Sequence, residues 1–455
     1  MSIEKVTIPS ISSSKMGKEF YTVLSVELGN TTIKSIIITT NIKTNKSYEL
    51  NKCVDLTRNV DNPGDSEEVF GHTIWNKPLS GQVIEKAVSR IIKKSLSEVG
   101  LDVSDLDFVV RSTGVVALSS LSYHMDVIIK SLSNGCLNAG IKPSQMMAPF
   151  SINNIPEHIR KSSFFNNIKF DGSIVGVASP RKTGVVSNEM ESQLVTAGIK
   201  LASKSSTVDY RNPVISIDMG TTLAGEVVDD SKPYGKLVCN YIGLAGGISD
   251  IILRGCDVIE DNMSTIDIAN NQNNIQFNED ILHKHTIKLH EFIDIMKVPK
   301  NLGEFGQVRI DLTLQKQENI NIIGSRINNS KKLITTFNNI TQDYTNSEIL
   351  LQIDDMYAYF IKRLIDQTSK LNIIQPKTTL GITGRAGITG YKPYFIEKYL
   401  KNSFDNILFT PDGLALGALM MARCMNSLGT PINPVGGSRG GMCIMQQRIK
   451  LSKKR

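Results

Sequence analysis

The stretch "VISIDMGTTLAGEVV" at residues 214–228 decides how this chain folds. Two runs rich in Val and Ile are joined by Asp-Met-Gly-Thr-Thr, which leaves no room for a helix. The pattern therefore predicts a strand, a tight turn and a second strand. Alternation places Ser216 and Asp218 on one face of the first strand and apolar side chains on the other. An acid at the end of a buried strand indicates that the turn has a chemical role.

The same design occurs near the start of the chain, in "YTVLSVELGNTTIKSIIITT" at residues 21–40. There Ser25-x-Glu27-x-Gly29-Asn30-Thr31-Thr32 aligns with Ser216-x-Asp218-x-Gly220-Thr221-Thr222, and the two acids lie 218 − 27 = 191 residues apart. A repeat at that distance indicates a duplicated domain, because it is too long for a solenoid unit. Two ordinary β-hairpins, with Thr present for its strand propensity, are the alternative.

The residue types explain what such turns can do. We expect Gly29 and Gly220 to adopt φ > 0 and to let a ligand approach the backbone closely. The Thr hydroxyls and backbone N–H groups could line a small anion-binding concavity. The acid could hold hydrated Mg²⁺ or orient a water molecule. Two such turns facing each other across a cleft would grip the phosphates of a nucleotide from both sides.

The rest of the chain predicts an α/β fold, because strands alternate with helical stretches such as residues 81–100 and 349–372. We divide it into a polar lead-in (1–19), a first domain (20–210), a second domain (211–431) and a basic tail (432–455). The Asn-rich segment at about 258–345 is predicted to be a helical insertion with polar loops in the second domain.

Composition argues against several classes of protein. No apolar run approaches the roughly 18 residues of a membrane span, and residues 1–20 lack a signal-peptide core, so we expect a cytoplasmic protein. Six Cys without a C-x-x-C pair argue against a sequence-local zinc or iron–sulfur site. The net charge of +7 lies partly in the tail, which could touch RNA or an acidic partner or simply be solvated. Because no nucleic-acid-binding motif accompanies it, we expect no nucleic-acid partner.

The paired turns resemble the first and second phosphate motifs of the acetate and sugar kinase, Hsp70 and actin superfamily. That resemblance implies two ribonuclease-H-like domains flanking a nucleotide cleft, the actin-like ATPase fold. The superfamily also has a late adenosine motif, and "TTLGITGRAGITG" at residues 378–390 resembles it. Its glycines would lie beneath the adenosine, although a plain strand-to-helix loop is the alternative. Arg385 could stack on adenine or face solvent.

A closer resemblance is to the ATPase domain of reductive activators of corrinoid proteins. It covers about residues 20–257 and 349–427, with "STGVV", "YHMDVIIKSL", "QMMAPF", "GLAGGISDIILRG" and "PDGLALGALMMA" as the matching stretches. Those activators carry iron–sulfur clusters in additional domains, and we expect neither those domains nor their Cys spacing in this chain. An electron carrier would therefore come from a partner protein. As a stand-alone version of that domain, the chain resembles the methanogenesis marker protein 14 family of methanogens.

The resemblance implies a set of site residues. Catalysis would fall to Glu27, Asp218 and Glu189, with Mg²⁺ held by Glu27 and Asp218. ATP would be bound by Gly29, Asn30, Thr31, Thr32, Gly220, Thr221, Thr222, Gly246, Gly247, Gly381, Gly384, Arg385 and Gly387. Glu189 would be the general base, although an exposed helix start is the simpler explanation. Glu27 stands where the superfamily usually has Asp, and Asn30 where it usually has Thr, which favours slow turnover.

The expected function is that of an ATP-binding, slowly ATP-hydrolysing protein. Domain closure would be coupled to activation or maturation of a methanogenic metalloenzyme, either a corrinoid or a nickel tetrapyrrole protein, which would be its protein partner. A small-molecule kinase and a non-catalytic nucleotide-sensing scaffold are the two alternatives. His283, His285 and His290 lie close together in the Asn-rich segment and could bind a metal or simply belong to a polar insert.

Overall fold

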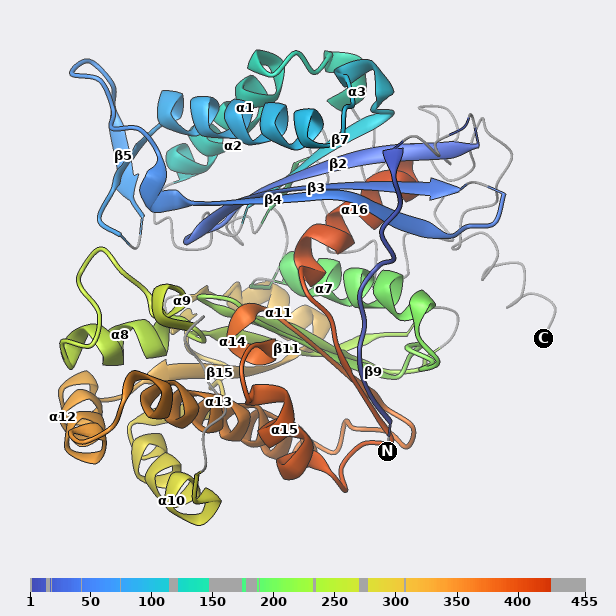
Figure 1. The fold of residues 1–455 in the computed structure, drawn as a ribbon. Coiled ribbons are helices and arrows are strands. Elements are labelled where there is room, and N and C mark those ends of the chain that lie inside the picture. Colours follow the sequence, from blue (N-terminus) through green and yellow to red (C-terminus); the bar gives the residue numbers. More distant parts are fainter. Residues whose placement is uncertain are drawn as a thin grey trace.

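The computed structural model describes most of the chain, in ranges separated by gaps. They are residues 2–13, 17, 19–41, 43–73, 75–113, 122–146, 174–176, 186–187, 189–231, 235–269, 277–306 and 308–426. Within these ranges the strands form an eight-stranded sheet, a five-stranded sheet and two small ribbons. Figure 1 shows the two large sheets as layers one above the other, with two helices between them. The predicted basic tail lies outside the described residues.

The five-stranded sheet contains the first predicted turn. Its order is β4-β3-β2-β7-β8, with β3 antiparallel to β2 and β4, and with β7 parallel to both β2 and β8. The strands are β2 (Phe20–Leu28), β3 (Thr32–Asn41), β4 (Ser47–Leu56), β7 (Phe108–Thr113) and β8 (Ile174–Gly176). If these five strands are numbered in chain order, they lie across the sheet in the order third, second, first, fourth, fifth.

The eight-stranded sheet repeats this arrangement at its centre. Its order is β1-β17-β16-β9-β10-β11-β15-β12. The strands are β1 (Ser2–Lys5), β9 (Val214–Met219), β10 (Leu223–Val228), β11 (Leu237–Gly243), β12 (Ile293–Lys297), β15 (Asn321–Ile327), β16 (Thr379–Thr383) and β17 (Asn406–Phe409). From β11 to β17 the order is again third, second, first, fourth, fifth, with the second strand antiparallel to its neighbours. The mixed α/β class is confirmed, and the topology agrees with the repeat seen in the sequence.

Strand alternation explains how each sheet divides its two faces. Leu24, Val26 and Leu28 of β2 pack with the apolar stripe of α1 (Gly81–Glu98) and with α2 (Ser122–Asn138). On the other face of β2, Tyr21 and Val23 pack with a different cluster, toward the eight-stranded sheet. Because side chains alternate, Glu27 lies on this second face, where the two sheets meet.

The remaining elements connect or cover the sheets. They are β5 (Val69–His72), β6 (Pro78–Ser80), β13 (Glu304–Phe305), β14 (Val308–Arg309), α3 (Pro143–Met146), α7 (Glu189–Ala202), α8 (Gly247–Gly255), α9 (Thr265–Ile268), α10 (Glu279–His290), α11 (Leu312–Glu318), α12 (Ser330–Thr341), α13 (Asn346–Ser369), α14 (Arg385–Ile388), α15 (Lys392–Leu400) and α16 (Gly413–Asn426). Among the described helices, none combines the length and hydropathy of a bilayer-spanning segment.

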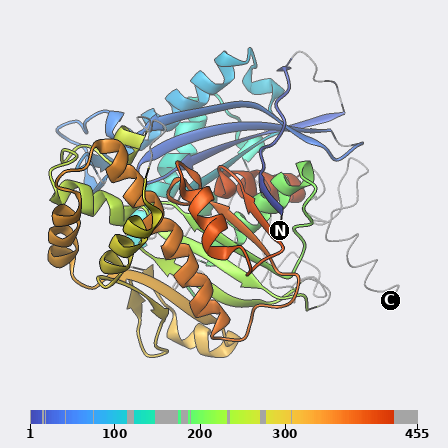
Figure 2. The same cartoon turned by 60° about the horizontal axis from the view of Figure 1, so that its bottom comes forward.

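The Asn-rich segment contains strands as well as the helices that we expected, and its being an insertion remains a prediction. It contributes β15 and β12, which extend the eight-stranded sheet beyond β11, and Figure 2 shows its yellow and orange helices gathered at one side of the molecule. Much of its Asn content serves local structure. Asn278 and Asn329 cap α10 and α12 through their side chains, and Asn319 ends α11 in the left-handed conformation.

The first residues are not the polar lead-in that we expected. Strand β1 pairs in parallel with β17 at one edge of the eight-stranded sheet, and Val6 and Ile8 are buried. Four residues after the end of β1 the chain pairs with the other sheet, because Glu49 of β4 donates its N–H to Pro9 O at 2.8 Å. Figure 1 shows this dark blue segment running from one sheet to the other. The segment therefore joins both halves of the molecule.

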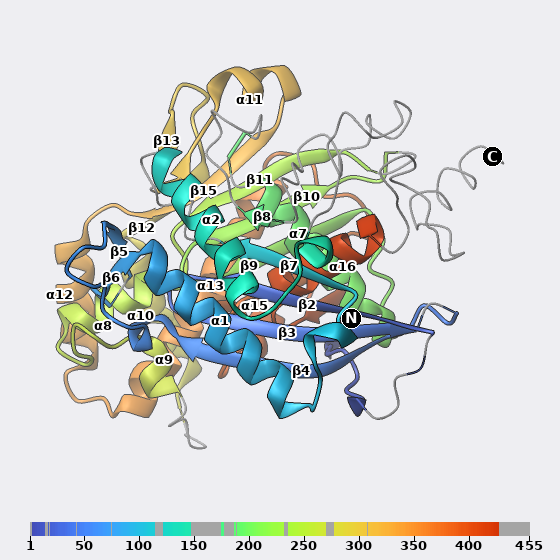
Figure 3. The same cartoon turned by 90° about the horizontal axis from the view of Figure 1, so that it is seen from above.

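Two helices lie between the sheets. Helix α16 packs on β2 and β7, while α7 packs on β9 and β10, and the two helices contact each other, as Figures 1 and 3 both show. Glycines allow this close approach. A methyl group on Gly198 would lie 1.8 Å from the carbonyl oxygen of Gly413, and one on Gly417 would lie 1.8 Å from that of Leu194. Contact between bare backbones therefore sets the spacing of the two sheets. The boundary near residue 210 remains a prediction.

Replacing Gly417 by Ala should strongly destabilise the protein, because the new methyl group overlaps backbone that cannot move away. We expect the free energy of unfolding, measured with urea, to fall by about 3 kcal/mol or more. Gly303→Ala is the matched control, since no atom lies within 4 Å of the added methyl group. Equal urea midpoints for the two variants would contradict the close helix crossing.

Candidate functional site

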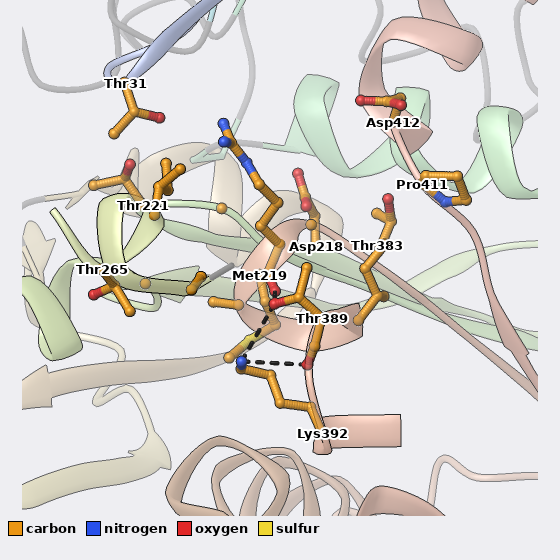
Figure 4. Close-up of a pocket in the computed structure, with 18 of the residues that line it drawn as sticks. Thr31, Asp218, Met219, Thr221, Thr265, Thr383, Thr389, Lys392, Pro411 and Asp412 are labelled. Atoms are coloured by element: carbon orange, nitrogen blue, oxygen red, sulfur yellow. Dashed lines mark hydrogen bonds between the residues drawn. The ribbon is translucent and has the colours of Figure 1, made fainter. Parts of the chain in front are cut away.

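A cavity of about 970 Å³ lies where the two sheets meet, and both predicted turns line it. Gly29, Asn30, Thr31 and Thr32 come from the five-stranded sheet, and Gly220, Thr221 and Thr222 from the eight-stranded sheet. Figure 4 shows Thr31, Thr221 and Asp218 around the same pocket. The volume is in the range of small-molecule sites. Residues 191 positions apart in sequence are thus brought to one cavity.

The first turn is held by a neighbouring loop. The Gly29 N–H donates to Thr32 O at 2.8 Å, which closes the hairpin. The Thr57 hydroxyl donates to Asn30 O at 2.8 Å, and Trp75 Nε1 donates to the Thr57 hydroxyl at 2.9 Å. These bonds fix the backbone of the turn before any ligand binds, which reduces the entropy lost on binding.

The second turn is held by the Gly-rich loop that precedes α8. The Gly246 N–H donates to Gly220 O at 2.7 Å, and the Gly247 N–H donates to Thr221 O at 3.0 Å. A methyl group on Gly246 would lie 2.6 Å from Gly220 O, so only Gly allows this contact. Gly246 lines the cavity, whereas Gly247 is not among the lining residues and acts through the turn.

The conformational role expected for the turn glycines is wrong. Neither Gly29 nor Gly220 has a positive φ. Their lack of a side chain matters in another way. A methyl group on Gly220 would have only Thr222 O within 4 Å, at 3.5 Å, so it would occupy free space where the turn lines the cavity.

Three buried carboxylates meet in the cavity. Glu27, Asp218 and Glu191 are between 7% and 8% exposed, and all three line it. Burial raises the pKa of Asp218 to about 7, with Lys34 opposing and Glu27 adding to the shift. Burial, Asp218 and Glu27 together raise the pKa of Glu191 well above its usual value. Such raised values indicate a site built for a cation or for proton transfer.

Glu191 is the acid that sequence reasoning missed. We assigned the role of general base to Glu189, which begins α7 but whose side chain lies outside the described residues. Glu191 stands two residues further along α7, and its carboxylate faces the other two acids. Residues 191–199 of α7 are all buried, so no polar–apolar periodicity in the sequence indicates the direction in which Glu191 points.

Lys34 and Asp412 complete the charged part of the cavity, and neither was predicted. Lys34 is the cross-strand partner of Glu27 in the hairpin; its Nζ lies 3.8 Å from Glu27 Oε1 and 3.4 Å from Asp412 Oδ1. Lys52 of β4 also pairs with Asp412. Burial opposes the charge of Lys34, but Glu27 and Asp412 raise its pKa above the usual value. These ion pairs join one sheet to the other beside the two turns.

The predicted adenosine motif only partly lines the cavity. Gly384 and Arg385 do so, while Gly381 and Gly387 are not among the lining residues. A methyl group on Gly381 would lie 2.7 Å from the Tyr210 hydroxyl, so this glycine serves packing inside the sheet. Gly387 likewise faces Met219 and Ile382.

Gly384 has a role that the sequence did not indicate. Its φ of +82° is open mainly to Gly, and a methyl group there would lie 2.3 Å from Asp218 Oδ1. The backbone of Gly384 therefore packs directly against Asp218, next to the end of β9.

One end of the cavity is mainly apolar. Leu350, Ile353 and Tyr357 of α13 line it together with Ile388 of α14. At its base the buried Lys392 pairs with Asp354. It also donates to Thr389 O at 3.3 Å, and Figure 4 shows this contact between Lys392 and Thr389. An apolar slot with a few fixed polar groups suits a flat organic ring.

The donor set of the cavity fits Mg²⁺. One carboxylate oxygen of Glu27, Oε2, is buried and has no hydrogen-bond partner among the described residues. Hard oxygen ligands of this kind are those that Mg²⁺ prefers, usually with waters and substrate phosphates completing its shell. Within the described ranges there is no group of three or more side chains that would bind a metal unaided. The His residues of α10 contact separate partners, such as Tyr399 for His283 and Tyr344 for His285.

Comparison with known proteins shows the family of this chain. Residues 20–452 match the family described as "Uncharacterized protein conserved in archaea (DUF2114)". The chain belongs to this archaeal family. An uncharacterized protein of Methanocaldococcus jannaschii is 41% identical over 447 residues, covering 96% of this chain and 92% of the relative. One from Methanothermobacter thermautotrophicus is also 41% identical, covering 96% and 84% respectively.

Several solved structures align over most of the chain at low scores. Component A of (R)-2-hydroxyglutaryl-CoA dehydratase from Acidaminococcus fermentans has a TM-score of 0.38 at 10% identity, covering 88% of this chain and 97% of that one. The activator of 2-hydroxyisocaproyl-CoA dehydratase from Clostridium difficile, with bound ADPNP, has a TM-score of 0.38 at 9% identity, covering 95% and 98%. A reductive activator for corrinoid, iron-sulfur protein has a TM-score of 0.36 at 12% identity, covering 90% and 61%.

Asp218→Asn should stabilise the ligand-free protein at neutral pH. The pKa of Asp218 is about 7 in the folded protein and 3.8 as its reference value, so the folded state holds a proton that the unfolded chain releases. Wild-type stability is therefore lost as pH rises through that interval, by roughly 4 kcal/mol at most. Urea unfolding should show little difference between Asn variant and wild type near pH 4 and a more stable variant at pH 8.

Asp65→Asn is the control for this pH series, because Asp65 is exposed on the surface. A variant at Asp218 that is less stable than wild type at pH 8 would contradict the crowding of buried acids in the cavity.

Proposed function

We propose that this protein binds Mg-ATP in the cavity between its two sheets, with the phosphates between the two turns. The proposal rests on one observation: topologically equivalent turns of the two sheets, each after the first of the five strands that repeat in both, line one cavity together with the buried acids Glu27, Asp218 and Glu191. The backbone N–H groups and hydroxyls of such turns suit phosphate oxygens. The apolar end beside α13 suits the adenine ring.

Slow hydrolysis is the reaction that the side chains support. Glu27 and Asp218 would hold Mg²⁺, which would offset the charge of the phosphates when bound. Glu191 would orient the attacking water and accept its proton, for which a carboxylate of raised pKa is suited. The longer side chain of Glu27 is expected to slow turnover relative to an Asp at that position.

We further propose that nucleotide-dependent closure of the two halves assists activation or maturation of a methanogenic metalloenzyme, a corrinoid or a nickel tetrapyrrole protein. Support comes from the resemblance of the sequence motifs to corrinoid activators and from relatives in two methanogens. Scattered cysteines imply that a partner would supply the electrons. The name methanogenesis marker protein 14 and a cytoplasmic location belong to the same proposal.

A nucleotide-sensing scaffold is the second candidate. Lys34 Nζ lies 3.8 Å from Glu27 Oε1, so part of the negative charge that would hold Mg²⁺ is already balanced. Such a protein would bind ATP and change shape without hydrolysing it. Single-turnover incubation with Mg-ATP separates the two, because only the ATPase converts bound ATP to ADP.

Gly220→Ala tests the cavity without removing any charge. The variant should fold normally, because its methyl group meets ordinary contacts only, but it should lose at least about 10-fold in affinity for Mg-ATP by calorimetry. Gly71→Ala, which also adds a methyl group in open space, should bind like wild type. If well-folded wild type shows no binding to Mg-ATP, the proposed function is wrong.

A further inference from the structure

Arg385 holds a position in the cavity that the sequence did not reveal. It is the first residue of α14 and follows Gly384, whose backbone packs against Asp218. A displacement of Asp218 would therefore also displace the backbone at Arg385. The backbone at Arg385 is thus held in place, whereas its side chain is long.

The guanidinium of Arg385 reaches from one sheet to the other. Its Nη2 donates to Thr32 Oγ1 of the first turn at 3.2 Å. Because Thr32 belongs to the five-stranded sheet and Leu350 and Ile353 lie on α13, the guanidinium is directed away from the apolar end. The structure therefore favours a role at the phosphates over stacking on adenine.

Nearby carboxylates favour the charged form of this guanidinium, but its hydrogen bond is to an uncharged group. Burial lowers the pKa of Arg385, whereas Asp412, Glu27 and Asp250 favour its charged form. Three other cations that line the cavity, Lys34, Lys52 and Lys392, are already paired with carboxylates. The hydrogen bond that the structure shows for Arg385 is to a neutral hydroxyl. A phosphate would be a much stronger partner for this planar fork than Thr32 is.

We propose that Arg385 is a specificity-determining residue that binds the terminal phosphate of a nucleoside triphosphate and so distinguishes it from the diphosphate. This inference rests on the proposed function. A nucleotide with its base at the apolar end would extend its phosphates toward the two turns, and its last phosphate would meet the guanidinium beside Thr32. The diphosphate lacks the terminal phosphate, so with it bound Arg385 would keep its hydrogen bond to Thr32.

Arg385 would therefore contact the other sheet in two alternative ways, either through the terminal phosphate or directly through Thr32. With the triphosphate bound, Arg385 of the eight-stranded sheet and Thr31 and Thr32 of the other sheet would share one ligand. After loss of the terminal phosphate, the guanidinium of Arg385 would keep its hydrogen bond to Thr32, beside the ion pairs of Lys34 and Lys52 with Asp412. Release of the two halves would then follow hydrolysis, as a signalling cycle requires.

Calorimetry with Mg-ADPNP and Mg-ADP tests this assignment on the full chain. Wild type should bind the triphosphate analogue more tightly than ADP. Arg385→Ala should lose about 10- to 100-fold in affinity for the analogue and less than about 3-fold for ADP. Arg385→Lys keeps the charge without the planar fork and should lose an intermediate amount. Arg211→Ala, an exposed arginine that contacts only Asp209 in the described structure, is the matched control.

Each other result overturns the inference in a recognisable way. Tighter binding of both nucleotides by Arg385→Ala would show that the guanidinium blocks the cavity. Equal losses for both nucleotides would show that it only supports the shape of the site. Failure of wild type to bind either nucleotide would overturn the proposed function together with this inference, whereas the first two results would leave nucleotide binding intact.

Discussion

The burial of three carboxylates at one point is the constraint on which the rest of the structure depends. Glu27 lies next to the end of a strand of one sheet, Asp218 next to the end of the equivalent strand of the other, and Glu191 in the first turn of the helix α7 between them. Like charges in a poorly solvated cavity are unfavourable unless cations or protons balance them. The raised pKa values of Asp218 and Glu191 record this imbalance. A ligand that carries Mg²⁺ would relieve it, which links stability to binding.

Other features follow from holding these acids in place. Gly384 brings backbone against Asp218, Gly246 presses on the second turn, and the bare crossing of α7 and α16 sets how closely the sheets approach. Lys34 and Asp412 then tie the sheets together at the edge of the cavity. The rigidity lies in the backbone and the adjustable groups are long side chains, an arrangement that suits a site meant to respond to its ligand.

The sequence predicted the elements whose signals are local. The two strand–turn–strand units and the helix at residues 81–100 depend on residues within a few positions of one another. Lys34 could have been found by counting back across the hairpin, since it pairs in register with Glu27. Asp412 and the inward direction of Glu191 could not, because they depend on how α16 and α7 pack. The N-terminal strand was missed because its buried residues are few and its partner, β17, lies about 400 residues away.

The central claim is that one nucleotide contacts both turns. A crystal structure of the protein with Mg²⁺ and ADPNP tests it most directly. The account predicts electron density for the β- and γ-phosphates between residues 29–32 and 220–222, with the base beside Tyr357 and Ile388. Density for the phosphates on one turn only, or at a different place on the molecule, would contradict it.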